Sequence, residues 1–153
     1  MRIGTKQCKI LSIAGPKGGV GRSSFTIELG LSLVQNDQSV LMIDLDPIRQ
    51  GLAILLDMPA QTMQDALEFL PLRTSTPQLD MVLLSLRTEQ VLACLEKLRA
   101  DGKYDYVIID LPPCMGEREA EIVLLSDLPV LMANAEPASL FAATQCLRFC
   151  TKQ

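Results

Sequence analysis

The chain alternates short apolar runs with amphipathic stretches. The apolar runs cover residues 9–15, 39–45, 79–85, 104–111 and 129–135. Each run is nearly continuous instead of alternating apolar with polar positions, which is typical of strands covered on both faces of a parallel sheet.

Helical patterns lie between these runs, and the sequence predicts helices over 23–35, 62–70, 88–102, 117–126 and 139–152. Thr62 and Asp65 form a candidate capping pair for the second of them, and Gly102 is a plausible stop for the third. That third helix carries an apolar stripe made of Val91, Leu92, Leu95 and Leu98.

Strands that alternate with helices predict one α/β fold class: a doubly wound, mainly parallel sheet with helices on both faces. Right-handed crossovers then bring the carboxyl ends of the strands to one edge, where ligands bind in such folds. Residues 15–24, 44–47 and 110–113 each follow the end of a predicted strand. We therefore expect these three stretches to meet in one crevice.

Length and charge narrow the class of protein. The 153 residues fit one domain, and 48% of them are apolar against 21% charged, as in a packed globular chain. The net charge of -4 and the 14 basic residues argue against a broad nucleic-acid-binding face on this segment. Without a long apolar span or a cleavable signal pattern, we expect a cytoplasmic protein.

The stretch GPKGGVGRSS, residues 15–24, has the composition of a phosphate-binding loop. Its four glycines permit a tight turn with inward N–H groups, and the helix that follows adds the positive end of its dipole. Ser23 is then placed as a hydroxyl ligand of Mg²⁺ and Ser24 as a further phosphate contact. A glycine-rich turn without a ligand is the alternative reading.

Two further stretches place carboxylates at strand ends. Asp44 and Asp46 lie two positions apart in LMIDLDP, so both can face the same side and hold a Mg²⁺-bound water or orient an attacking water. Asp110 ends VIID before a Pro-Pro pair and is expected to contact the ion directly or through water. Alone, the Asp44 and Asp46 pair would equally suit an ordinary turn.

Taken together, KGGVGRSS, DLDP, YDYVIIDLPP and NAEPASL resemble the MinD/ParA superfamily of ATPases with a deviant Walker A loop, from about residue 8 to the end of the chain. The resemblance implies that Lys17 is the family's signature lysine, which reaches the phosphates of the partner in an ATP-sandwiched dimer. It also implies that Asp44 positions the catalytic water and that Asp46 occupies the adjacent switch position. The segment 134–139 is similar to the MinD, FlhG and CpaE branches.

The expected site follows from this resemblance, with Lys17 and Asp44 as catalytic residues and ATP or ADP with Mg²⁺ as cofactors. The metal-site residues are Ser23, Asp46 and Asp110. The expected nucleotide-binding residues are Gly15, Lys17, Gly18, Gly19, Val20, Gly21, Arg22, Ser23 and Ser24.

Two departures from the family pattern stand out. Arg22 replaces the lysine that contacts the β- and γ-phosphates, and a planar guanidinium is not equivalent to a compact ammonium. The chain is also short, so we expect residues 1–153 to form a single P-loop nucleotide-binding domain that lacks the C-terminal part of the family fold. A membrane-targeting helix or adenine contacts would belong to that part, and membrane association would be transient or depend on it.

The leading hypothesis is a Mg-ATP-binding molecular switch that dimerises on ATP, positions a regulatory or cargo protein and hydrolyses ATP slowly. The alternative is a localisation scaffold that binds nucleotide without hydrolysing it, because of Arg22. An iron–sulfur carrier would need cysteines in C-x-x-C form or paired across a dimer, and a tyrosine kinase would need a tyrosine-rich tail. Cys146 and Cys150 are interpreted as core residues, and Cys114 is a candidate redox-sensitive thiol beside the Asp110 loop.

Overall fold

The computed structural model describes residues 8–59, 69, 71–85, 88–114 and 116–151. Within this part of the chain, six strands form one sheet in the order β3-β4-β2-β5-β1-β6. The strands are β1 (Lys9–Ala14), β2 (Val40–Asp44), β3 (Leu72–Arg73), β4 (Leu79–Leu83), β5 (Tyr106–Asp110) and β6 (Leu128–Leu131). All neighbouring pairs are parallel except β3 and β4, so the sheet is mainly parallel.

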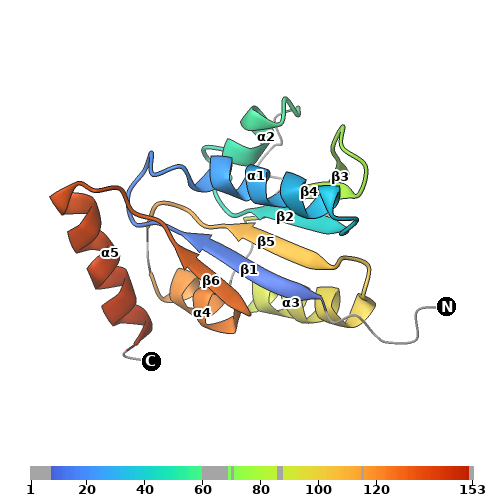
Figure 1. Ribbon diagram of the computed structural model, residues 1–153. Helices are drawn as coiled ribbons and strands as arrows, with labels where there is room; N and C mark the ends of the chain where they lie inside the picture. The colour runs from blue at the N-terminus through green and yellow to red at the C-terminus, as the bar shows by residue number, and fades with distance from the viewer. Residues whose placement is uncertain (1–7, 60–68, 70, 86–87, 115, 152–153) are drawn as a thin grey trace.

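Helices cover both faces of this sheet (Figure 1). They are α1 (Arg22–Gln35), α2 (Gly51–Leu55), α3 (Thr88–Asp101), α4 (Glu117–Leu125) and α5 (Pro137–Cys150). α1 and α2 lie on one face and α3 and α4 on the other, while α5 stands beside the β6 edge and packs against α4. None of the helices in the described ranges is long and apolar enough to cross a membrane.

The predicted doubly wound fold with helices on both faces is confirmed, but two short elements were not predicted. α2 has five residues and no side-chain cap, and β3 has two residues that pair with β4, so neither carries a periodic pattern of its own. β6 ends at Leu131, four residues before the predicted strand end, and α5 begins two residues earlier than expected. The helix predicted over 62–70 falls almost wholly outside the described residues.

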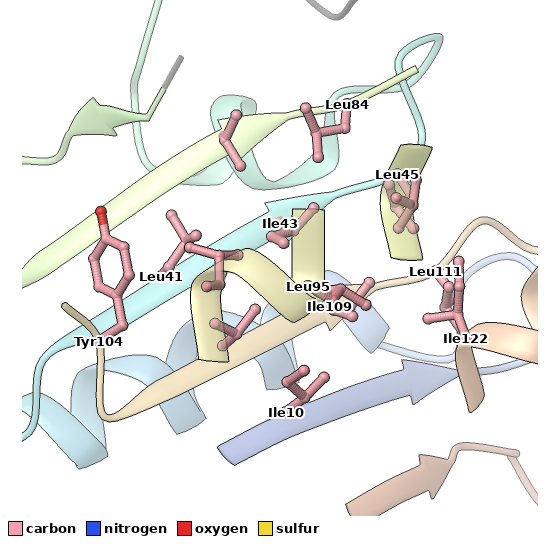
Figure 2. Close-up of a cluster of buried hydrophobic side chains, with 14 of the residues drawn as sticks. Ile10, Leu41, Ile43, Leu45, Leu84, Leu95, Tyr104, Ile109, Leu111 and Ile122 are labelled. Atoms are coloured by element: carbon pink, nitrogen blue, oxygen red, sulfur yellow. The ribbon is translucent and has the colours of Figure 1, made fainter. Parts of the chain in front are cut away.

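Nearly continuous apolar strands build two cores, one on each face of the sheet. In β5, Val107 and Ile109 point toward α3 and α4, whereas Ile108 points toward α1 and α2, and all three are fully buried. Figure 2 shows the first of these cores, where Ile10, Leu41, Ile43 and Ile109 from three strands meet Leu95 of α3 and Ile122 of α4. Both faces of the central strands are therefore dry, as the sequence pattern predicts.

The carboxyl ends of the central strands share one edge. The β2–β5 register pairs Asp44 with Asp110, and the β1–β5 register places Ile13 beside the same Asp110. β1 leads from that edge into the glycine-rich loop and α1. α3 ends at Asp101 and is followed by Gly102 with φ +60°, which confirms the predicted stop and returns the chain to β5 at the opposite edge.

Candidate functional site

The glycine-rich loop between β1 and α1 follows a path that requires several of its glycines. Gly19 and Gly21 have φ values of +79° and +90°, in the left-handed region that side chains disfavour. A Cβ on the buried Gly15 would lie 2.9 Å from Val20 Cγ2 and 3.0 Å from the carbonyl oxygen of Met132. Glycine at these positions is thus dictated by backbone conformation and by close packing.

A hollow of about 270 Å³ opens beside this loop at the carboxyl edge of the sheet. Its lining combines the loop, the start of α1 and the segments after β2 and β5, and comprises Gly18, Gly19, Gly21, Arg22, Ser23, Ser24, Asp44, Asp46, Arg49, Gly51, Asp110, Leu111 and Pro113. The three stretches predicted to meet do meet here. Gly15, Lys17 and Val20, which we also expected at the site, do not line the hollow.

Ser23 and Asp110 form the centre of the site. The Ser23 hydroxyl donates to Asp110 Oδ2 at 2.5 Å, while Asp110 Oδ1 is buried without a hydrogen-bond partner among the described residues. Burial raises the pKa of Asp110 to about 6, and the Ser23 hydroxyl and the Arg22 guanidinium partly oppose this shift. A hydroxyl and a carboxylate with an unpaired oxygen are ligands that suit Mg²⁺, so these residues fit the ion that accompanies a bound nucleoside triphosphate.

Asp44 is the most deeply buried carboxylate of the site, with 1% of its surface exposed. Its Oδ1 accepts the N–H of Asp46 at 2.9 Å, and its Oδ2 accepts the N–H of Leu52 at 3.1 Å. Burial raises the pKa of Asp44 to about 7, although these two hydrogen bonds favour the charged form. Asp44 therefore ties the end of β2 to the first turn of α2.

Two residues of the segment after β2 belong to the site and were not predicted. Arg49 lines the hollow and donates from Nη1 to Asp46 Oδ2 at 2.8 Å. Gly51 approaches Ser23 so closely that a Cβ there would lie 2.7 Å from Ser23 Oγ. The only sequence signal for either was their position within seven residues of the DLDP stretch.

Arg22 lies partly beneath the loop, with its side chain 10% exposed. Nη1 donates to the carbonyl oxygens of Gly15 at 2.6 Å and Lys17 at 2.8 Å, and Nε donates to the carbonyl oxygen of Leu111 at 3.0 Å. Nε also lies 3.9 Å from Asp110 Oδ1, and burial lowers the pKa of the guanidinium. The arginine that stands at the position of the expected lysine thus donates hydrogen bonds to three backbone carbonyls.

Lys17 does not line the hollow of its own chain. Its Nζ forms an ion pair with Glu136, the N-cap residue of α5, and both side chains are largely exposed. This hydrogen bond lowers the pKa of Glu136. An exposed pair of this kind is weak, so the ammonium is readily available to another partner.

The cysteines fit packing roles for the most part. Cys8 and Cys146 are buried, Cys94 and Cys150 are half-buried, and Cys114 is exposed near the site. Burial raises the pKa of the Cys114 thiol, which disfavours the reactive thiolate. Across the described ranges, no group of three or more His, Cys, Asp or Glu side chains is arranged to hold a metal ion by itself.

Comparison with known proteins gives this geometry a family context. The family model "ParA: NUBPL iron-transfer P-loop NTPase" matches residues 6–153. The chromosome partitioning protein ParA of Caulobacter vibrioides is 27% identical over 92% of this chain and 61% of its own length. Soj, the sporulation initiation inhibitor protein of Bacillus subtilis, is 26% identical over 91% of this chain and 63% of its own length. The chain therefore spans about three fifths of the length of these relatives.

Solved structures share the fold. The cell division protein MinD of Aquifex aeolicus superposes with a TM-score of 0.79 at 22% identity, over 94% of this chain and 64% of that protein. MinD of Pyrococcus horikoshii, solved with Mg-ADP, superposes with a TM-score of 0.72 at 22% identity, over 95% of this chain and 65% of that protein. Relatives named ParA and MinD both match this chain, at 27% and 24% identity.

The close approach of Gly51 to Ser23 predicts that Gly51→Ala destabilises the domain. The new Cβ would force Ser23 Oγ off its hydrogen bond to Asp110 or displace α2, which we expect to lower the free energy of unfolding by about 1–3 kcal/mol in urea titrations without nucleotide. Gly18→Ala is the matched control, because nothing lies within 4 Å of its Cβ position, and its effect should stay within about 0.5 kcal/mol. Equal effects of the two changes would contradict the contact.

The buried carboxylates predict that stability falls as pH rises. The folded-state pKa values of Asp44 and Asp110, about 7 and about 6, lie above the ordinary value of 3.8, so the folded state binds protons more tightly than the unfolded chain. The stabilising protonation is complete below pH 4 and is lost up to about pH 7. From pH 5 to pH 8 we expect the free energy of unfolding, without metal and nucleotide, to fall by about 4 kcal/mol, about two thirds of it from Asp44 and one third from Asp110.

Urea unfolding at several pH values measures this dependence. Asp44→Asn should flatten it, because the amide does not titrate and only the Asp110 contribution remains. A wild-type profile that is flat or rises over this range would show that the two carboxylates are not stabilised by protons in the folded state.

Proposed function

Because the chain belongs to the ParA family of P-loop NTPases, we propose that it is a Mg-ATP-binding molecular switch that dimerises on ATP and positions a partner protein or cellular structure. The observation that carries the proposal is the contact between Ser23, at the start of α1, and Asp110, both of which line the hollow. Residues 1–153 supply the P-loop nucleotide-binding domain of this switch.

Nucleotide binding is supported by three kinds of group around the same hollow. The amides of Gly18, Gly19 and Gly21 and the N-terminal end of the 14-residue helix α1 favour phosphate. Ser23 would hold Mg²⁺, with Asp110 contacting the ion or a water bound to it and Asp46 beside them. When bound, the ion would neutralise charge that develops on the phosphates.

Slow hydrolysis is supported by the placement of Asp44. Its carboxylate lines the hollow, is held by two backbone N–H groups and has a pKa near neutrality, so it can orient a water molecule and accept a proton from it. Because both oxygens already accept a hydrogen bond, Asp44 acts from a fixed position and not as a mobile base.

Dimerisation is supported by the position of Lys17. Its ammonium does not line the hollow of its own chain, and among the described residues its partner is Glu136, in an exposed ion pair. Exchanging that pair for the phosphates of a second subunit places the lysine in trans, as the family resemblance implies. MinD of Aquifex aeolicus has been solved in complex with MinC, and by analogy the ATP-bound dimer is the form that we propose recruits a partner protein.

A scaffold that binds nucleotide without turnover is the second candidate, and one observation favours it. The Arg22 guanidinium is engaged with three backbone carbonyls, so its charge is not free to follow the γ-phosphate as a flexible ammonium would. Binding through loop amides and Mg²⁺ is compatible with this arrangement, whereas acceleration of phosphate transfer is more sensitive to it.

Lys17→Ala should abolish ATP-dependent dimerisation while leaving nucleotide binding nearly unchanged, because Lys17 does not line the hollow of its own chain. Light scattering with ADP, ATP and a slowly hydrolysed ATP analogue, combined with calorimetric nucleotide titrations in Mg²⁺, measures both properties. Lys97→Ala, on the exposed side of α3, is the control. A folded wild-type protein that binds neither ATP nor ADP would overturn the proposal, and a monomer in all three nucleotides would overturn its dimerisation step.

Steady-state phosphate release separates the switch from the scaffold. For the switch we expect slow, Mg²⁺-dependent release that falls at least tenfold in Asp44→Asn, because the amide cannot accept a proton from water. No release by the wild type, together with a sharp gain in Arg22→Lys, would favour the scaffold and identify the arginine as the cause.

A further inference from the structure

We propose that Arg22 is a positioning residue that holds the glycine-rich loop in its phosphate-binding shape before any nucleotide arrives. Arg22 lies at the end of the loop, and its side chain donates to the carbonyls of Gly15 and Lys17 at the start of the loop. It also donates to the carbonyl of Leu111, in the loop that follows β5. The functional role of a preformed loop rests on the proposed nucleotide binding, whereas the three hydrogen bonds of Arg22 are present without nucleotide.

The forked shape of the guanidinium is what makes this arrangement possible. Nη1 reaches two carbonyls at 2.6 and 2.8 Å while Nε reaches the third at 3.0 Å, so two different nitrogens with fixed separation and direction are used. The ammonium of a lysine has its donors on a single atom and cannot reproduce both directions. Arginine at this position therefore links the glycine-rich loop to the loop after β5 through hydrogen bonds that lysine could not make together.

The loop needs such support because its glycines leave the backbone wide conformational freedom and few packing contacts. Gly19 and Gly21 adopt left-handed conformations, and no heavy atom lies within 4 Å of where a Cβ would stand on Gly18 or Gly19. The carbonyls of Gly15 and Leu111 belong to buried residues, so the loss of their donors would leave polar groups unpaired away from water. Charged hydrogen bonds from a side chain that is 10% exposed are strong enough to select one loop shape.

The burial and charge of the site support the same role. Asp110 Oδ1 has no hydrogen-bond partner in the described part of the chain, and Arg22 Nε lies 3.9 Å away from it, so the guanidinium also balances the charge of that carboxylate. In nucleotide-free protein the arginine thus joins the glycine-rich loop to the end of β5, where Ser23 and Asp110 already meet. The amide donors of the loop would then already be in place, so nucleotide binding would cost little conformational entropy.

Limited trypsin digestion without nucleotide tests this role, because Lys17 is itself a cleavage site within the loop. Cleavage after Lys17 needs local opening, whereas cleavage after Lys97 in α3 needs unfolding of a helix and serves as an internal reference. We expect Arg22→Lys to raise the rate of cleavage after Lys17 at least tenfold and to change the rate after Lys97 less than twofold. Fragment masses identify each cut.

Arg99→Lys is the matched control, since Arg99 also donates to a backbone carbonyl, that of Leu125, and contacts a carboxylate far from the loop. It should leave cleavage after Lys17 unchanged. Equal rates after Lys17 in wild type and Arg22→Lys would overturn the proposal, and so would parallel increases at Lys17 and Lys97, which would show that Arg22 stabilises the whole domain.

A second arm with Mg-ADP separates this inference from the proposed function. Bound nucleotide should return the Arg22→Lys rate after Lys17 to the wild-type value, because phosphate then orders the loop in place of the guanidinium. Faster cleavage in the variant without any protection by Mg-ADP would retain the positioning role of Arg22 and count against nucleotide binding.

Discussion

The parallel pairing of β2 with β5 is the constraint on which the site depends. It sets Asp44 opposite Asp110 at the same edge of a sheet whose central strands are dry on both faces. If β2 shifted by one residue against β5, one carboxylate would point into a hydrophobic core and an isoleucine would take its place at the site. The apolar packing around Ile43, Ile108 and Ile109 therefore holds the polar chemistry in place as well as the fold.

Placing carboxylates at that edge opposes stability, and the surrounding polar contacts offset the cost only in part. Asp44 receives two backbone N–H groups and Asp110 receives a hydroxyl and a nearby guanidinium, yet the pKa of each remains well above its ordinary value. Such sites are typical of places where a bound cation supplies the missing positive charge. The Mg²⁺ that we propose for this edge would offset that cost.

The sequence predicted the elements whose signals are local. Nearly continuous apolar runs located five strands, Gly102 located the end of α3, and strand ends located Ser23, Asp44 and Asp110. It did not predict α2 and β3, which are too short to show a period, nor the inclusion of Arg49 and Gly51 in the site. The contacts of Lys17 with Glu136 and of Arg22 with Leu111 also escaped prediction, because these partners lie 119 and 89 residues away in the chain.

The hydrogen bond from Leu52 to Asp44 has a consequence for the outer surface of the molecule. α2 is a single short helix whose start is fastened to a buried carboxylate, while Ile54 and Leu55 expose 71% and 54% of their surface. The hydrogen bond from Leu52 thus fixes the start of the helix that carries these two exposed apolar side chains. A partner that contacts Ile54 and Leu55 would therefore contact a helix whose first turn is hydrogen-bonded to a carboxylate of the site.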